Sequence, residues 1–165
     1  MLSAFSQNPE FAGRPYLWQN NVALSDLERA DAQLDSKLKG LGYGGVRLMY
    51  TVFSGRSNVR FNRNHLQKLI IKVAEGIDPS ESYTIVKAEV KKDKRSFLVS
   101  SYSMVGRAKD TKDTYIKAEF KRIKDGIYEI TLPSDIEEGE YGFLGVASEG
   151  TLMGNRVKIS CFGID

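Results

Sequence analysis

Apolar residues alternate with polar ones over much of the chain from Val46 onward. Val46, Leu48, Tyr50 and Val52 show this pattern first, and later segments repeat it. Successive side chains of an extended strand point to opposite faces, so a period of two indicates strands with one buried face. About eight such segments, roughly 10 to 15 residues apart and with no helix between them, predict an antiparallel β-sandwich rather than alternating βαβ units.

The strongest short turn signal in the chain is Asp125-Gly126, which predicts a hairpin between two of these strands. The fold class is therefore mainly β, with a sandwich of seven or eight strands over residues 46–165. The expected strands run over residues 46–52, 69–73, 86–90, 98–104, 116–120, 128–132, 141–146 and 157–164.

Residues 1–45 read as a separate N-terminal region. Two prolines and several asparagines predict an irregular arm over residues 1–22, whose aromatic side chains pack on the body or on a partner. A helix is expected from Asp26 to Lys39, because Ser25 and Glu28 form a capping box and leucines recur at helical spacing. The glycines of segment 40–45 follow this helix and precede a strand, so they indicate helix termination rather than a phosphate-binding loop.

The segment from Leu132 to Phe143 joins two of the expected strands. Its core, Glu137-x-Gly139-x-Tyr141-x-Phe143, resembles the Asp-x-Gly-x-Tyr-x-Cys corner of immunoglobulin domains, where a tyrosine returns its hydroxyl to the backbone upstream. Glutamate replaces the aspartate, and Phe143 stands where antibody domains have a disulfide cysteine. The resemblance implies an immunoglobulin-like sandwich outside the antibody class, with Tyr141 joining two sheets at a glycine corner.

A second resemblance covers about residues 44 to 147. The blocks that carry it are Arg56-Ser57-x-Val59-Arg60-Phe61, Leu69–Val73 followed by Asp78-Pro79, Gly126–Ile130 and Gly139–Phe143. In these blocks the chain looks like a bacterial family of β-sandwich domains that has no assigned activity and no agreed catalytic residues.

A single cysteine, Cys161, and a single histidine, His65, limit the available chemistry. One cysteine excludes an intrachain disulfide, and one histidine excludes a metal site with several histidine ligands. Cys161 lies in an alternating apolar run, which is typical of a buried and unreactive thiol, whereas His65 lies among polar loop residues. We therefore predict that the protein is not an enzyme and has no metal and no cofactor.

Acidic side chains gather at residues 135–140, where they leave two alternatives open. Paired carboxylates are the groups that hydrolyse glycosides, and their oxygens also ligate calcium weakly. Their position on a tight corner favours a solvated turn over either site.

The net charge of +3 conceals a strong segregation along the chain. Residues 46–74 hold six Lys or Arg and no acid, residues 87–124 have a net charge of +7, and residues 125–149 have a net charge of −7. Cross-strand pairing of these segments would neutralise much of this charge. The cluster Lys91–Arg95 is expected at a solvated hairpin tip, with a landing site for an acidic partner as the alternative.

The first 16 residues lack the basic start and the apolar stretch of a secretory signal. No window approaches the roughly 20 apolar residues that cross a bilayer, so no membrane span is expected. Localisation stays open: the protein is cytoplasmic if Met1 is the natural start and secreted if a leader has been removed.

The sequence favours a non-catalytic protein-binding or structural module, with self-association through edge strands as one form of partnership. The alternative is carbohydrate or cell-surface binding on exposed aromatic side chains, while nucleic acid is disfavoured because no known nucleic-acid module appears. The candidate partner-binding residues are Tyr16, Trp18, Arg56, Arg60, Phe61 and Arg63.

Overall fold

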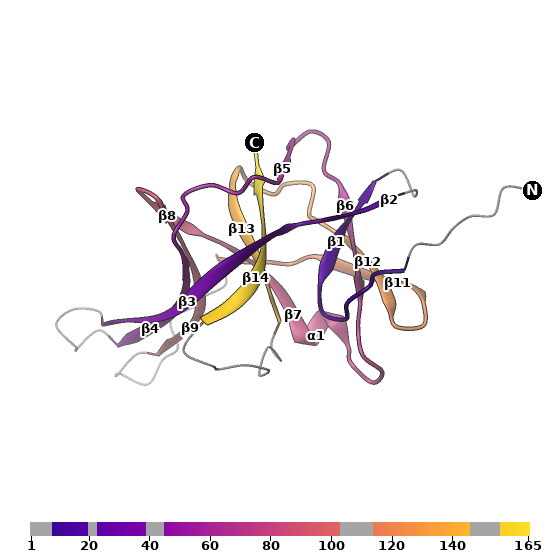
Figure 1. Ribbon diagram of the computed structural model, residues 1–165, viewed down its shortest axis with the longest axis horizontal. Helices are drawn as coiled ribbons and strands as arrows, with labels where there is room; N and C mark the ends of the chain where they lie inside the picture. Colours follow the sequence, from indigo (N-terminus) through magenta and orange to yellow (C-terminus); the bar gives the residue numbers. More distant parts are fainter. Residues whose placement is uncertain (1–7, 20–22, 39–44, 103–113, 146–155) are drawn as a thin grey trace, which may run out of the picture.

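The computed structural model describes residues 8–19, 23–38, 45–102, 114–145 and 156–165 (Figure 1). Most of these residues lie in β-strands, and the one helix among them is the four-residue α1 (Pro79–Ser82). The prediction of a mainly β fold class is therefore confirmed. No helix in this part of the chain is long and apolar enough to cross a membrane.

The first sheet contains five strands in the order β11-β12-β6-β1-β2, each antiparallel to its neighbours. Strand β11 is a terminal strand of this sheet, and a register shift between Arg122 and Lys124 interrupts its pairing with β12. The bounds are β1 (Pro15–Gln19), β2 (Ala23–Asp26), β6 (Lys68–Lys72), β11 (Glu119–Lys124) and β12 (Ile127–Thr131).

The second sheet has the order β10-β7-β13-β14-β3-β4-β9-β8, and the short β5 pairs with β14 in parallel. The long strand β3 lies between β14 and β4 and crosses the front of the molecule in Figure 1. The bounds are β3 (Glu28–Leu38), β4 (Val46–Val52), β5 (Arg60–Phe61), β7 (Tyr83–Lys87), β8 (Glu89–Lys91), β9 (Lys94–Tyr102), β10 (Tyr115–Ile116), β13 (Gly139–Gly145) and β14 (Arg156–Ile164).

The largest core cluster draws on both sheets. Leu17, Leu69 and Ile71 come from the first sheet, and Phe143 and Phe162 come from the second. A second cluster, which includes Ala32, Phe97 and Cys161, forms on strands of the second sheet alone. Burial of apolar area in the first cluster holds the two sheets together, and burial in both clusters stabilises the fold.

The prediction of a helix over Asp26–Lys39 is wrong, because Asp26 ends β2 and Glu28–Leu38 form β3. Lys39 lies outside the described residues. Ala30 and Ala32 are buried and alternate with the exposed Arg29, Asp31 and Gln33, which is the period of a strand. Backbone hydrogen bonding to β14 on one side and β4 on the other outweighs the local capping signal. Of the glycines in segment 40–45, only Gly45 lies within the described residues.

The expectation of an irregular arm over residues 1–22 is also wrong for part of its described residues, 8–19, while residues 1–7 and 20–22 lie outside the description. Pro15–Gln19 form β1, which lies between β2 and β6 in the first sheet. Pro15 is the first residue of the strand, a position at which a missing backbone N–H is tolerated.

Six of the expected strands from residue 46 onward are confirmed within the described residues, which exclude 103–104 and 146. The other two, at 86–90 and 116–120, each span the ends of two separate strands, so seven or eight is too low a number. The described residues from 45 onward contain eleven strands, β4 to β14, several of them only two or three residues long. A strand of two or three residues has too few positions to show an alternating pattern in the sequence. The predicted hairpin at Asp125-Gly126 is confirmed, and Gly126 has a φ of 71°, which a residue with a Cβ rarely adopts.

Tyr141 is fully buried, and its hydroxyl donates a hydrogen bond of 2.7 Å to the carbonyl oxygen of Glu137. The bond spans four residues and fixes β13 to the turn that precedes it. A contact this local does not identify an immunoglobulin topology, and that resemblance stays a prediction.

Candidate binding groove

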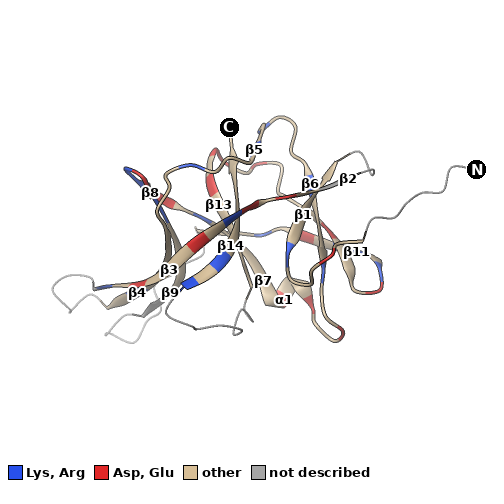
Figure 2. Cartoon of the chain, viewed as in Figure 1, with Lys and Arg blue, Asp and Glu red and all other residues tan. Residues whose placement is uncertain are grey.

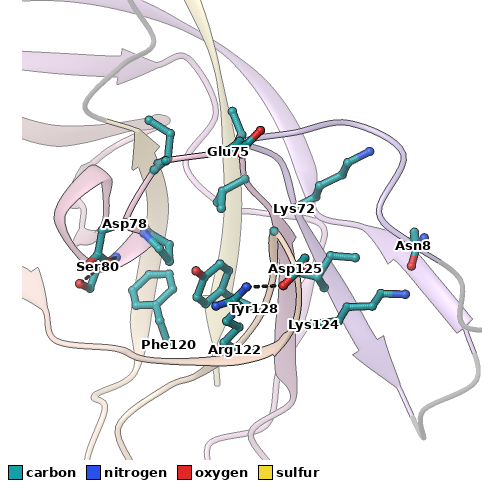
Figure 3. A pocket seen from close by; sticks show the side chains of 17 residues that line it. Asn8, Lys72, Glu75, Asp78, Ser80, Phe120, Arg122, Lys124, Asp125 and Tyr128 are labelled. Carbon is teal, nitrogen blue, oxygen red and sulfur yellow. Dashed lines mark hydrogen bonds and ion pairs between the residues drawn. The ribbon is translucent and has the colours of Figure 1, made fainter.

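A groove with a volume of about 1420 Å³ lies between two turns of the described structure. One wall is the turn between β6 and α1, and the other is the β11–β12 hairpin (Figure 3). It is lined by Asn8, residues 72–80, Phe120, Arg122 and residues 124–128.

Backbone contacts fix the two walls relative to each other. The backbone N–H of Val73 donates to the carbonyl oxygen of Gly126 over 2.8 Å. A Cβ at position 126 would lie 3.1 Å from the Val73 oxygen, so glycine permits the close approach as well as the turn. The hairpin turn therefore docks directly on the chain that leaves β6.

The facing wall is set by the start of α1. Asp78 is the N-cap, and its carboxylate accepts from the backbone N–H and the hydroxyl of Ser80 over 2.9 and 2.6 Å. These hydrogen bonds hold the pKa of Asp78 below its ordinary value. Pro79 occupies the first helical turn, where its ring is favoured.

Two half-buried aromatic residues supply the apolar part of the groove. Phe120 and Tyr128 lie on the inner face of the β11–β12 hairpin, packed against the core that the two sheets share. Ile77, on the opposite wall, is 37% exposed. No described residue bonds to the Tyr128 hydroxyl, so the groove offers a free polar group beside its rings.

Charges of both signs stand around these rings. Arg122 forms an ion pair with Asp125 at the hairpin turn (Figure 3). Lys72 and Glu75 are exposed and form no ion pair with any other described residue. The wall formed by residues 72–80 therefore presents a cation and an anion that have no ion-pair partner among the described residues.

The residues predicted to bind a partner do not form this groove. Tyr16 is buried in β1, where the guanidinium of Arg14 stacks 5.4 Å from its ring centre. Trp18 packs, half-buried, in a small cluster with Tyr16, on the sheet face opposite Leu17. Neither ring provides an open platform.

The other four predicted residues lie in or beside β5, close to the end of β14. Phe61 is only 2% exposed and stacks on Phe162, so its ring is part of the core and offers no surface for stacking. Arg63 is exposed, Arg56 forms an ion pair of 3.2 Å with Asp165, and Arg60 forms ion pairs with Glu140 and Asp165.

Arg60 belongs to a network of alternating charges that reaches the interior. Glu140 links Arg60 to Arg95, which is fully buried and donates two hydrogen bonds of 2.8 Å to the carboxylate of Glu28. Gly163 leaves room for this arrangement, because a Cβ there would lie 1.8 Å from a guanidinium nitrogen of Arg60. The network joins β3, β5, β9, β13 and the end of β14.

The residues of the Lys91–Arg95 cluster therefore lie in two different environments. Lys91, Lys92 and Lys94 lie at a solvated hairpin tip as predicted, but Arg95 is an internal residue. Its Nε also donates to the carbonyl oxygen of Ser54 over 2.8 Å.

The expected neutralisation of the acidic segment is confirmed in part, for Asp125, Glu129, Glu137 and Glu140. Residues 146–149 of this segment lie outside the described residues. Glu129 on β12 pairs with Lys68 on the neighbouring β6 over 2.7 Å, and Glu137 pairs with Lys87. Figure 2 shows acidic and basic residues interleaved along β3, which pairs with the basic end of β14. The segregation of charge along the chain is thus reduced in three dimensions.

Cys161 and His65 lie as the sequence predicts. Cys161 is fully buried, and burial raises the pKa of its thiol to about 12, which keeps it unreactive. His65 is exposed in a turn after β5. Among the described residues, no group of three or more His, Cys, Asp or Glu side chains is placed to hold a metal ion.

Sequence reasoning missed the groove, although two signals for its walls were present. Asp78-Pro79 is an N-cap followed by proline at the first helical position, a recognised helix start. Asp125-Gly126 located the hairpin. The nearness of these two turns depends on pairing between β6 and β12, which are more than 50 residues apart.

The chain was compared with protein families, curated proteins and solved structures. No family model, no curated protein and no solved structure matches the chain.

Proposed function

We propose that the protein is a non-catalytic binding module whose groove takes an extended segment of a partner polypeptide. The observation that carries the proposal is the size of the groove, about 1420 Å³, with half-buried aromatic rings along one wall. Sites for small molecules enclose about 300 to 1,000 Å³. A longer ligand, lying along the groove, fits this space better.

The chemistry of the walls supports a polypeptide. Phe120 and Tyr128 provide apolar area with little conformational entropy to lose, as aromatic anchors do at protein interfaces. Lys72 and Glu75 lack ion-pair partners among the described residues, so a segment with charges of both signs would satisfy both. Asp78 and Asp125 are engaged in the cap and in the ion pair with Arg122, which favours a structural role for these carboxylates.

The test is selection from a library of random peptides displayed on a solid support. We expect the wild-type protein to enrich peptides that share an apolar residue, and Phe120→Ala to weaken their binding by about tenfold or more, or 1.4 kcal/mol. Ile123→Ala is the matched control, because Ile123 is 49% exposed on the same strand and does not line the groove.

A second pair of variants guards against loss of structure. Arg122→Ala removes a side chain that lines the groove, and Lys121→Ala removes a neighbouring charge that does not. Circular dichroism establishes that each variant is folded. The proposal is overturned if no peptide is enriched, if each variant binds like its control, or if a glycan array gives binding and the peptide library does not.

A further inference from the structure

A second, smaller cavity lies on the far side of the turn that follows β6. Its volume is about 390 Å³, within the range of sites for small molecules. Residues from β3, β7, β13 and β14 and from the segment before β1 line it. Ala74 and Ile77 border both this cavity and the groove, so the turn separates the two spaces.

Tyr83 forms one wall of the cavity. Its ring stacks on Phe143 with centroids 5.5 Å apart. Glycines make room for it, since a Cβ at Gly13 would lie 3.0 Å from the Tyr83 hydroxyl and a Cβ at Gly145 would lie 3.1 Å from the ring. Burial raises the pKa of Tyr83, so the hydroxyl stays protonated, and no described residue accepts its hydrogen bond.

Arg29 gives the cavity an unneutralised positive charge. Its guanidinium donates to the Ser160 hydroxyl over 2.9 Å and forms no ion pair with a described carboxylate. The carboxylate of Asp26 is bonded instead to Arg14, over 2.9 Å. Loss of solvation and the charge of Arg14 lower the pKa of Arg29, so a bound anion would relieve both costs.

Lys158 adds a second cation to the lining. It pairs with Asp31 over 2.9 Å, but both side chains are more than half exposed, and exposed pairs of this kind are weak. Lys158 can therefore turn toward an anion at small cost.

We infer that this cavity binds a small organic anion, a carboxylate or phosphate monoester carried on a flat ring. The anionic group lies against Arg29 and Lys158, where a planar guanidinium makes two parallel hydrogen bonds to such groups. The ring lies against Tyr83, and the phenolic hydroxyl donates a further hydrogen bond. This site is separate from the groove, and its ligand is independent of the proposed polypeptide.

The test is calorimetric titration of the full chain with phenyl phosphate, benzoate, inorganic phosphate and benzyl alcohol. We expect phenyl phosphate or benzoate to bind, inorganic phosphate to bind at least tenfold more weakly because it lacks the ring, and benzyl alcohol not to bind because it lacks the charge. Arg29→Gln should weaken the bound probe at least tenfold. Arg63→Gln is the matched control, since Arg63 is exposed and lies outside the cavity lining.

Tyr83→Phe tests the hydroxyl while keeping the ring. We expect it to weaken binding severalfold and to leave the thermal midpoint of unfolding close to that of the wild type. The inference is overturned if no probe binds, if inorganic phosphate or benzyl alcohol binds as well as phenyl phosphate, or if Arg29→Gln and Arg63→Gln have the same effect.

Discussion

At the scale of single residues, the buried carboxylate of Glu140 contacts groups of three other residues. It accepts a hydrogen bond of 2.8 Å from the backbone N–H of Ser57, forms an ion pair with Arg60 and lies 3.6 Å from Arg95. A buried charge that loses a partner costs far more than an exposed one, because no water replaces the lost contact.

We predict that Glu140→Gln lowers the free energy of unfolding by about 3 kcal/mol, because it leaves the buried Arg95 with less opposing charge. Urea denaturation measures the loss. Glu138→Gln is the matched control: Glu138 is exposed two residues away, and its change should stay within about 0.5 kcal/mol. Equal losses in the two variants would contradict the internal role of Glu140.

At the scale of elements, the β8–β9 hairpin contains two features that lower its stability. Lys92, in its turn, has a φ of 54°, in the left-handed region that favours glycine and asparagine. Lys91 and Lys94 lie directly opposite each other across the strands, and like charges in that position repel.

We predict that Lys92→Asn raises the free energy of unfolding by about 1 kcal/mol, because asparagine tolerates the left-handed conformation better. The measurement is the midpoint of urea unfolding. Lys91→Asn is the control, since it removes a neighbouring lysine without changing the turn, and should stabilise by only a few tenths of a kcal/mol through relief of repulsion. A smaller gain for Lys92→Asn than for its control would count against turn strain.

Elements were predictable where one local signal decided them. The alternation of residues 46–52 and the Asp125-Gly126 turn each identified their elements. Strand β3 was not predictable, since its capping box and leucine spacing favour a helix in isolation and its two neighbouring strands decide otherwise. Arg95 and the groove depend in the same way on residues distant in sequence, so charge runs and local motifs could not place them.

At the scale of the whole molecule, opposite shifts in pKa predict a stability maximum near neutral pH. On the acid side, burial opposes ionisation of Glu28, but hydrogen bonds from Arg95 and Ser57 and the charge of Arg95 prevail, so its pKa is lowered. Hydrogen bonding to Arg60 likewise lowers the pKa of Asp165. A lowered carboxyl pKa stabilises the fold above its ordinary value near 4, and this contribution disappears as pH falls through the folded-state pKa.

On the alkaline side the shifts are upward. Burial, and then the charge of Glu137, raises the pKa of Tyr141 from 10.0 to about 12, and burial raises that of Cys161 from 9.0 to about 12. The unfolded chain therefore loses these protons first, so stability falls as pH rises from about 9 to about 12.

We predict that urea unfolding, measured across a series of pH values, gives a dome with both limbs. Tyr141→Phe should be less stable at neutral pH, because it loses the hydrogen bond to Glu137, but should show a shallower alkaline decline. If the free energy of unfolding of Tyr141→Phe falls as steeply with alkaline pH as that of the wild type, ionisation of Tyr141 does not cause the alkaline loss of stability.

The contact between Arg60 and Gly163 has a consequence for how this fold can change over time. The guanidinium occupies the space where a Cβ at position 163 would stand. A larger residue at 163 would displace the Arg60 guanidinium from this space, and the displaced side chain would lose its ion pairs with Glu140 and Asp165. Substitutions at positions 60, 140, 163 and 165 are therefore expected to depend on one another.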